Sequence, residues 1–208
     1  LSWRDSSSND PVGILGECFV KNSMNIYRIH FSENDSLQIL GKETPKTLIE
    51  DVDFSQLVVD KPWGYEYLMY RNPFVQVWSL FIKGNEITSM HCHPNKKTSL
   101  VLLEGEAVFS TLNTSIHLKA YDSVIIDVGV FHSTRPVTDN GVRVLEIETP
   151  PLKYDLVRLK DDYGRAGTFY EGKNKMRADN NGYLRFSELA KSGYVEEEFF
   201  GSGLCLRK

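Results

Sequence analysis

The feature that most limits how this chain can fold is a succession of short segments rich in β-branched and aromatic residues between residues 65 and 149. Turn-forming residues interrupt it about every eight to twelve positions, a spacing typical of all-β sandwiches and barrels. Breaks such as Asn72-Pro73, Glu104-Gly105 and Asn140-Gly141 supply residues that tolerate tight turns. The expected strands are 65–70, 74–83, 98–103, 106–112, 116–120, 123–127, 131–135 and 142–148.

The connections between these segments are too short for crossover helices, so the strands must pair mostly antiparallel. The sequence therefore predicts an all-β sandwich or barrel. We expect an N-terminal extension that is partly β over residues 1–60, a barrel over 61–165, and a C-terminal extension over 166–208. The first extension contains a candidate strand at 25–31, and the last contains one short candidate helix at 183–191.

Composition excludes several classes of protein. Of the 208 residues, 41% are hydrophobic and 12% are aromatic, unlike a disordered tail or a collagen-like repeat. The formal net charge is -4 and no long Lys/Arg cluster occurs, so we expect no nucleic acid partner. No apolar run approaches the roughly 20 residues that cross a bilayer, so we expect no membrane association. The 3 cysteines, at unrelated spacings, are expected to be free thiols in a reducing cytoplasm.

Four of the five histidines fall inside the β-rich region, and three of these, His91, His93 and His132, are candidates for a metal site. His91 and His93 lie two residues apart, so on a strand their imidazoles project to one face while Cys92 projects to the other. His132 lies at the start of a later candidate strand, from which a third imidazole can be delivered across a barrel. Three neutral imidazoles suit a divalent metal ion and leave coordination positions open. The alternative is that the first two are surface or hydrogen-bonded histidines.

Two segments, in the right order, resemble the paired motifs of the cupin superfamily. Residues 84–105, which contain His91-Cys92-His93, are similar to the first motif. Residues 121–136, which contain Gly129 and His132, are similar to the second. The resemblance implies a double-stranded β-helix, or jelly-roll barrel, with a divalent metal ion at the three histidines. Zinc is the first expectation, with iron, manganese and nickel as alternatives.

The flanks of these motifs narrow the resemblance. Lys61-Pro62-Trp63-Gly64 ahead of the barrel and residues 155–165 behind it are similar to segments around the cupin of type II mannose-6-phosphate isomerases. The resemblance covers residues 61–165, about half the chain.

The chain departs from the family pattern at the metal. The first cupin motif normally carries a glutamate seven residues before its closing glycine, and Thr98 stands there instead. Ser89 replaces a glutamine that precedes the histidine pair in the isomerases. Glu146 and Glu148 share one face of the last barrel strand. If that face lines the barrel, one of them lies near the metal as ligand, hydrogen-bonding partner or base. Otherwise both are solvated or hydrogen-bonded at the rim.

Basic and aromatic residues near the predicted metal are candidates for substrate binding. Lys96 and Lys97 follow the histidine pair and suit a phosphate or carboxylate at the rim, unless both are simply solvated. Arg165 matches the place of a family arginine expected to meet the sugar phosphate or the enediolate; its alternative is a surface ion pair. Trp63 could stack on a sugar ring, although an aromatic there is more typical of a core. Tyr163 is a lesser candidate.

The sequence favours an enzyme, and the resemblance implies aldose–ketose isomerisation of a sugar phosphate or nucleotide sugar in polysaccharide precursor metabolism. Glu146 or Glu148 would move the proton, and Lys96, Lys97 or Arg165 would hold the anion. Two alternatives are a carbohydrate-binding or regulatory cupin without turnover, which the missing glutamate favours, and an iron-dependent dioxygenase. We expect a homodimer, because an open cupin leaves strand edges that a second copy can cover.

Overall fold

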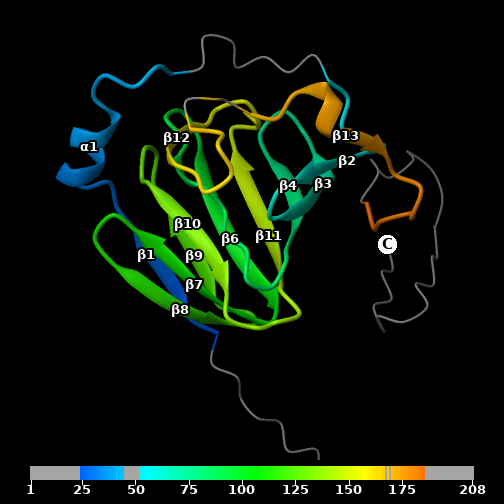
Figure 1. Ribbon diagram of the computed structural model, residues 1–208, viewed down its shortest axis with the longest axis horizontal. Helices are drawn as coiled ribbons and strands as arrows, with labels where there is room; N and C mark the ends of the chain where they lie inside the picture. The colour runs from blue at the N-terminus through cyan, green and yellow to red at the C-terminus, as the bar shows by residue number, and fades with distance from the viewer. Residues whose placement is uncertain (1–23, 45–51, 167, 169, 186–208) are drawn as a thin grey trace, which may run out of the picture.

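The chain folds into two facing β-sheets, which Figure 1 shows as two layers. The computed structural model describes residues 24–44, 52–166, 168 and 170–185. The larger sheet has eight strands in the order β1-β9-β6-β11-β4-β3-β2-β13, and the smaller has five in the order β12-β5-β10-β7-β8. From β4 to β12 the chain passes repeatedly between the sheets, as in a double-stranded β-helix.

The strands are β1 (Ile26–Ile29), β2 (Leu57–Lys61), β3 (Gly64–Arg71), β4 (Gln76–Ile82), β5 (Met90–Cys92), β6 (Lys97–Glu104), β7 (Glu106–Thr111), β8 (Ser115–Lys119), β9 (Ser123–Ile126), β10 (His132–Pro136), β11 (Val142–Thr149), β12 (Val157–Lys160) and β13 (Met176–Ala178). One α-helix, α1 (Glu33–Ile39), and one 3-10 helix, η1 (Lys173–Lys175), complete the described elements.

The prediction of an all-β fold is confirmed. Each strand expected between residues 65 and 148 is present, and the strand pairs of the described residues are antiparallel except that of β1 with β9. The strands β2, β5, β12 and β13 lie outside the predicted set. β5 and β13 have three residues each, too few to show an alternating pattern. Their pairing is set by strands distant in sequence, which a local pattern does not reveal.

The core lies between the two sheets. Trp78 on β4 and Phe109 on β7 are fully buried members of one hydrophobic cluster, so side chains from both sheets close it. Phe54, which precedes β2, packs edge-on against Trp78 with ring centroids 5.1 Å apart. Trp63, in the turn between β2 and β3, belongs to the same cluster. Phe54, which lies ahead of the predicted barrel, therefore contributes to its core.

The N-terminal segment holds the backbone that leads into β10. β1 extends the large sheet by pairing with β9 (Figure 1). Helix α1 begins with a capping box, in which Ser32 and Asp35 each accept the other's backbone N–H. The second carboxylate oxygen of Asp35 accepts the backbone N–H of Phe131 at 2.9 Å. The ring of Phe31 covers Gly129 so closely that a Cβ there would lie 2.8 Å from it. These contacts fix the chain just before β10.

The C-terminal segment covers the other edge of the large sheet. β13 pairs with β2, and the Arg185 guanidinium donates to the backbone carbonyls of Phe54, Leu57 and Leu68. The helix predicted at 183–191 falls largely outside the described residues, and its first residues, 183–185, are not helical. No helix in the described part of the chain is long and apolar enough to span a membrane.

Gly141, in the turn before β11, has no room for a side chain. Its φ is +80°, and a Cβ on it would lie 2.2 Å from the backbone oxygen of Ile82. We expect Gly141→Ala to lower the free energy of unfolding by about 2–4 kcal/mol, because backbone strain and overpacking add. Gly41→Ala is the matched control, since Gly41 has φ +79° with nothing within 4 Å, and should lose about 1 kcal/mol. Urea denaturation measures both; equal losses would contradict the steric argument.

Candidate metal centre

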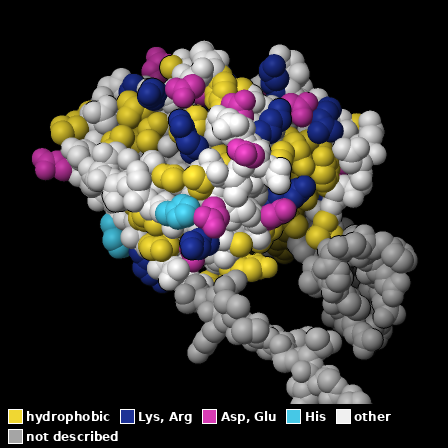
Figure 2. All heavy atoms as spheres, turned by 60° about the horizontal axis from the view of Figure 1, so that its bottom comes forward, with side chains coloured by type: hydrophobic (Ala, Val, Ile, Leu, Met, Phe, Trp, Pro, Cys, Tyr) yellow, Lys and Arg dark blue, Asp and Glu magenta, His cyan; other side chains and the backbone are white. Residues whose placement is uncertain are grey.

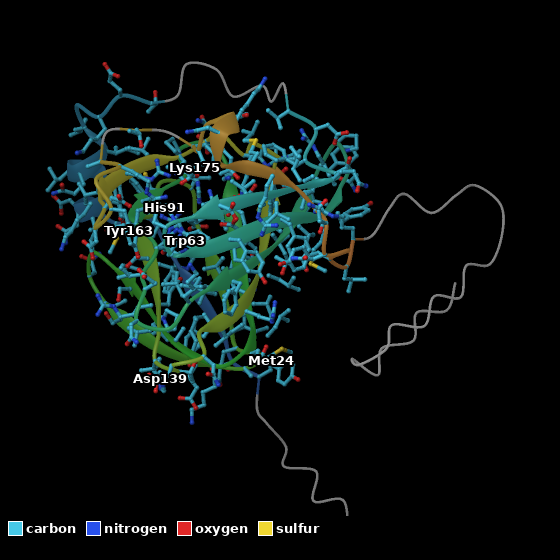
Figure 3. All side chains as sticks on the ribbon, turned by 45° about the vertical axis from the view of Figure 1, so that its right-hand side comes forward. Met24, Trp63, His91, Asp139, Tyr163 and Lys175 are labelled. Carbon is cyan, nitrogen blue, oxygen red and sulfur yellow. The ribbon has the colours of Figure 1, made fainter. Side chains whose placement is uncertain are left out.

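Three histidines from neighbouring strands converge inside the barrel. His91 on β5 is the cross-strand partner of His132 on β10, and His93 follows β5 by one residue. Their ligand atoms all lie within 4.8 Å of one another, and the ring centroids are 5.0, 4.5 and 5.4 Å apart. In Figure 3, His91 lies near Trp63 toward one end of the barrel, and Asp139 lies at the other end. The predicted convergence of the three imidazoles is confirmed.

Each imidazole is oriented by a hydrogen bond from Nδ1 to a backbone carbonyl. The acceptors are Ser89 for His91 at 2.8 Å, Asp155 for His93 at 2.6 Å, and Val130 for His132 at 2.9 Å. Because a carbonyl only accepts, Nδ1 carries the proton and Nε2 keeps its lone pair. The Nε2 of His93 is buried without a hydrogen-bond partner among the described residues. These donors fit a divalent metal ion held through Nε2 atoms.

Burial keeps the imidazoles neutral, the form that binds metals. Burial lowers the pKa of His91 and of His93 well below the ordinary value, and it lowers the pKa of His132 to about 4. The positive charge of Lys96 acts in the same direction on each ring.

No carboxylate of the described residues joins the three imidazoles. Thr98, at the position of the family glutamate, is 1% exposed, and its hydroxyl finds no hydrogen-bond partner within the described residues. Glu148 lies directly across the β6–β11 ladder from Thr98. Its carboxylate accepts hydrogen bonds from Lys96 at 2.6 Å and from Gln76. The candidate site therefore offers three neutral ligands, which leaves positions open for water or substrate as in catalytic zinc sites.

A small cavity of about 50 Å³ lies beside the histidines. Its walls carry both signs of charge. The cations are Lys61, Lys96, Lys153, Arg158 and Arg165, and the carboxylates are Glu66, Glu146, Glu148 and Glu171. The buried carboxylate of Asp161 pairs with Arg165 from behind the wall, so five carboxylates balance the five cations, and a divalent metal ion would give the cavity an excess of positive charge. The cavity therefore favours an anionic ligand.

Lys153 is the centre of the buried charges. Its ammonium lies 3.2 Å from Glu66, 3.3 Å from Glu146 and 3.5 Å from Glu148. It also lies 3.9 Å from the ring centroid of Trp78. Burial alone would lower the pKa of Lys153, but the three carboxylates outweigh burial and raise it. The ammonium therefore stays charged and offsets the burial of three acidic groups.

Glu146 and Glu148 share the inner face of β11 but differ in protonation. Burial raises the pKa of Glu146 to about 7, although Lys153 opposes the shift. Burial acts on Glu148 in the same direction, but the charges of Lys153 and Lys96 and hydrogen bonds from Lys96 and Gln76 lower its pKa below the usual value. Glu146 is therefore suited to exchange a proton near neutral pH, whereas Glu148 stays ionised.

The carboxylate of Glu171, also in the cavity wall, accepts hydrogen bonds from three cationic side chains. Its Oε2 accepts a hydrogen bond from the Lys61 ammonium. Its Oε1 accepts from Arg158 at 3.1 Å and from Arg165 at 2.5 Å. Lys61 also lies 3.2 Å from Glu66, which pairs with Lys153. Ion pairs thus connect this group with the centre of the cavity.

The structure separates the two adjacent lysines. Lys96 lines the cavity and is 1% exposed. Lys97 lies on the outer surface, where its ammonium pairs with Asp127 at 2.9 Å. Adjacent residues of an extended chain project to opposite sides, so only one of the pair faces the histidines. This corrects the expectation that both line the rim. On the outer face in Figure 2, basic and acidic side chains are interspersed.

The other predicted substrate residues have mixed surroundings. Arg165 lines the cavity and also pairs with Asp161 at 2.6 Å. Trp63 lines the cavity and packs in the core, so both of its expected roles are compatible with its position. Tyr163 is not among the cavity-lining residues. Its hydroxyl lies 2.6 Å from a carboxylate oxygen of Glu86.

Sequence reasoning missed the cavity residues Lys61, Glu66, Lys153, Arg158 and Glu171. Glu66 carried a signal, because it is the one acidic residue of β3 and only aromatic and apolar residues separate it from the end of the strand at Arg71. Lys61 and Arg158 lie in the two flanks that carry the family resemblance, but their chemistry shows only when the flanks meet. Lys153 and Glu171 lie in connections without a periodic pattern.

Comparisons with known proteins bear on the family. No family model matches the chain. The chain is similar to the mannose-1-phosphate guanylyltransferases of Klebsiella pneumoniae and Escherichia coli, each at 22% identity over 192 residues. The match covers 79% of this chain and 41% of each relative, so the chain spans about two fifths of their length.

Solved structures with a similar fold include an oxalate decarboxylase from Lactobacillus farciminis, with a TM-score of 0.44 and 15% identity over 49% of this chain and 33% of that one. An uncharacterised Klebsiella pneumoniae protein with a double-stranded β-helix domain has a TM-score of 0.42 and 16% identity over 46% of this chain and 84% of that one.

The fold class follows from the order of the strands in the two sheets. The two facing sheets have the strand order of a double-stranded β-helix. The three histidines of the two sequence motifs meet within this fold. The chain therefore has the cupin fold, a double-stranded β-helix.

Proposed function

We propose that this cupin binds a divalent metal ion at His91, His93 and His132 and interconverts the aldose and ketose forms of a phosphorylated sugar or nucleotide sugar. The observation that carries the proposal is the meeting of three imidazoles beside a cavity lined by five cationic side chains. The similarity to proteins named mannose-1-phosphate guanylyltransferase supports a sugar phosphate or sugar nucleotide as the ligand. A role in polysaccharide precursor metabolism is part of this proposal.

The roles of the residues follow from their surroundings. A bound metal ion would polarise the carbonyl and hydroxyl oxygens of the sugar. Glu146 would take the proton from the carbon beside the carbonyl and return it to the neighbouring carbon, since a pKa near 7 serves both steps. Lys153, 3.3 Å away, would hold this carboxylate in place. Lys96 and Arg165 would attract the anionic group, and Trp63 would offer a flat wall to the sugar ring.

Deuterium exchange tests this reaction directly. The zinc-loaded protein would be incubated in D2O with a panel of hexose phosphates and nucleotide sugars and followed by NMR. We expect one substrate to take up deuterium at the carbon beside the carbonyl and to form its ketose or aldose partner. Tight binding of a substrate without exchange or conversion would rule out the isomerase.

A binding cupin without turnover is the second candidate, favoured by Thr98 in place of the family glutamate. The same panel separates the two, because calorimetric binding without exchange is the result expected for this candidate. Oxygen uptake by the ferrous protein would instead indicate the dioxygenase alternative.

Glu146→Gln is expected to slow the exchange by about 100-fold or more, the usual contribution of a general base. Ligand affinity should change little. In the wild-type protein the rate should rise as the pH passes through about 7, because the carboxylate must lose its proton to act as a base. Lys153, Glu148, Lys96 and Glu66 face this group and set that pKa. Glu104→Gln, a change at an exposed carboxylate, is the control. An unchanged rate and pH profile in Glu146→Gln would assign the proton transfer elsewhere.

A further inference from the structure

We propose that Lys61, Arg158 and Arg165 form a subsite for the phosphate group of the ligand, and that the Glu171 carboxylate occupies this subsite until a phosphate displaces it. The proposal deepens the proposed function and rests on it only in taking the ligand to be phosphorylated.

Three positively charged side chains converge on one carboxylate. Both guanidinium groups donate to Oε1 of Glu171, and the Lys61 ammonium donates to Oε2. The side chains of Lys61, Arg158 and Glu171 are 4%, 2% and 5% exposed, and that of Arg165 is 15% exposed. Two guanidinium groups and an ammonium aimed at one point are the donors that proteins use for phosphate.

The subsite adjoins the candidate metal centre. Arg158 on β12 is the cross-strand partner of His91 on β5, and all the residues of the subsite line the same cavity as His91 and His93. A ligand whose phosphate displaced the Glu171 carboxylate would therefore share its cavity with the histidines.

The Glu171 carboxylate neutralises the three cations of the subsite less completely than a phosphate group would. A carboxylate brings one negative charge and two oxygens, while a phosphate monoester brings about 1.5 to 2 charges and three terminal oxygens. Glu66 also pairs with Lys61, and Asp161 also pairs with Arg165. These two carboxylates therefore offset part of the positive charge that Glu171 alone leaves unbalanced. Buried charge that is incompletely offset is costly. A phosphate in place of the carboxylate would complete the balance.

A purely structural ion cluster is the competing explanation. In that case neutralising Glu171 would weaken the fold, and no anion would restore it. A subsite behaves differently, because removal of its internal occupant frees the three cations to bind phosphate more tightly.

Inorganic phosphate is the probe that separates the two explanations. We would titrate the wild-type protein and Glu171→Gln with phosphate by calorimetry at fixed ionic strength. The dissociation constant should fall about tenfold or more in the variant, the equivalent of one charge-assisted hydrogen bond. Glu104→Gln removes an exposed carboxylate instead and should match the wild type. Adding Arg165→Gln to Glu171→Gln should abolish the gain.

An unchanged phosphate affinity in Glu171→Gln, or a gain that survives the loss of Arg165, would overturn the subsite. If Glu171→Gln is unfolded without phosphate, recovery of its folded circular dichroism spectrum on adding phosphate supports the subsite, and no recovery overturns it. The proposed reaction fails separately. Tighter phosphate binding with no sugar isomerisation by the wild type leaves the subsite standing, whereas isomerisation with unchanged affinity in the variant removes the subsite alone.

Discussion

The His91→Ala/His93→Ala double variant is expected to lose its metal while its barrel stays folded. Two of the three candidate ligand atoms disappear, and loss of even an outer hydrogen-bonding partner of a ligand weakens metal binding about 10–100-fold. We therefore expect apparent affinity to fall by more than about 100-fold. The backbone pairing of β5 with β10 and β12 does not involve the rings, so the sheet should survive.

Emission spectrometry of the dialysed protein measures its zinc, iron, manganese and nickel, and circular dichroism reports the fold. His30→Ala/His117→Ala is the matched control, since it also removes two imidazoles, both on the surface beside Asp127 and Glu106. The control should keep the metal content of the wild type. Full metal content in the first double variant would refute the three-histidine site.

Lys153→Met is expected to lower the free energy of unfolding by about 3–5 kcal/mol at pH 7, the usual cost of removing one partner from a buried ion cluster. Its ammonium is within 3.5 Å of Glu66, Glu146 and Glu148, and those carboxylates would keep their burial without its charge. Without Lys153 their pKa values rise, so they take up protons more readily. The loss should therefore be smaller at pH 5, where protonation offsets the missing charge.

Urea denaturation at both pH values measures this loss. Lys97→Met is the control, because it breaks an exposed ion pair with Asp127 and should cost no more than about 1 kcal/mol. Similar losses in the two variants, or a Lys153→Met loss that does not depend on pH, would show that the buried charges do not act as one cluster.

Much of the fold was predictable because it depends on local pattern. The strands between residues 65 and 148 are rich in β-branched and aromatic residues and end at turn residues, and both properties can be read along the chain. β5 has three residues and β12 has four; β5 pairs with β10 on one side and with β12 on the other. That pairing joins residues distant in sequence, so it cannot be predicted from a local pattern.

The candidate site also has residues that a local pattern predicts and residues that it does not. His91 and His93 were predictable because a spacing of two places both rings on one face, and the family motif added His132. The two lysines show where sequence reasoning fails. Because Lys96 and Lys97 are adjacent, both were expected at the site, but neighbouring side chains of an extended chain point to opposite sides, and only Lys96 faces the cavity. Lys153 looks like a solvated lysine in sequence. Its burial is tolerable only because three carboxylates from β3 and β11 surround it.

A form of the protein that began at residue 61 would lack β1 and α1. The backbone N–H and C=O groups of β9 that now pair with β1 would become a bare sheet edge, open to pairing with other molecules. The approach to His132 would lose its bond to Asp35 and the cover of Phe31 in the same step. We therefore expect the shortened form to aggregate more readily and to bind metal less well than the longer chain.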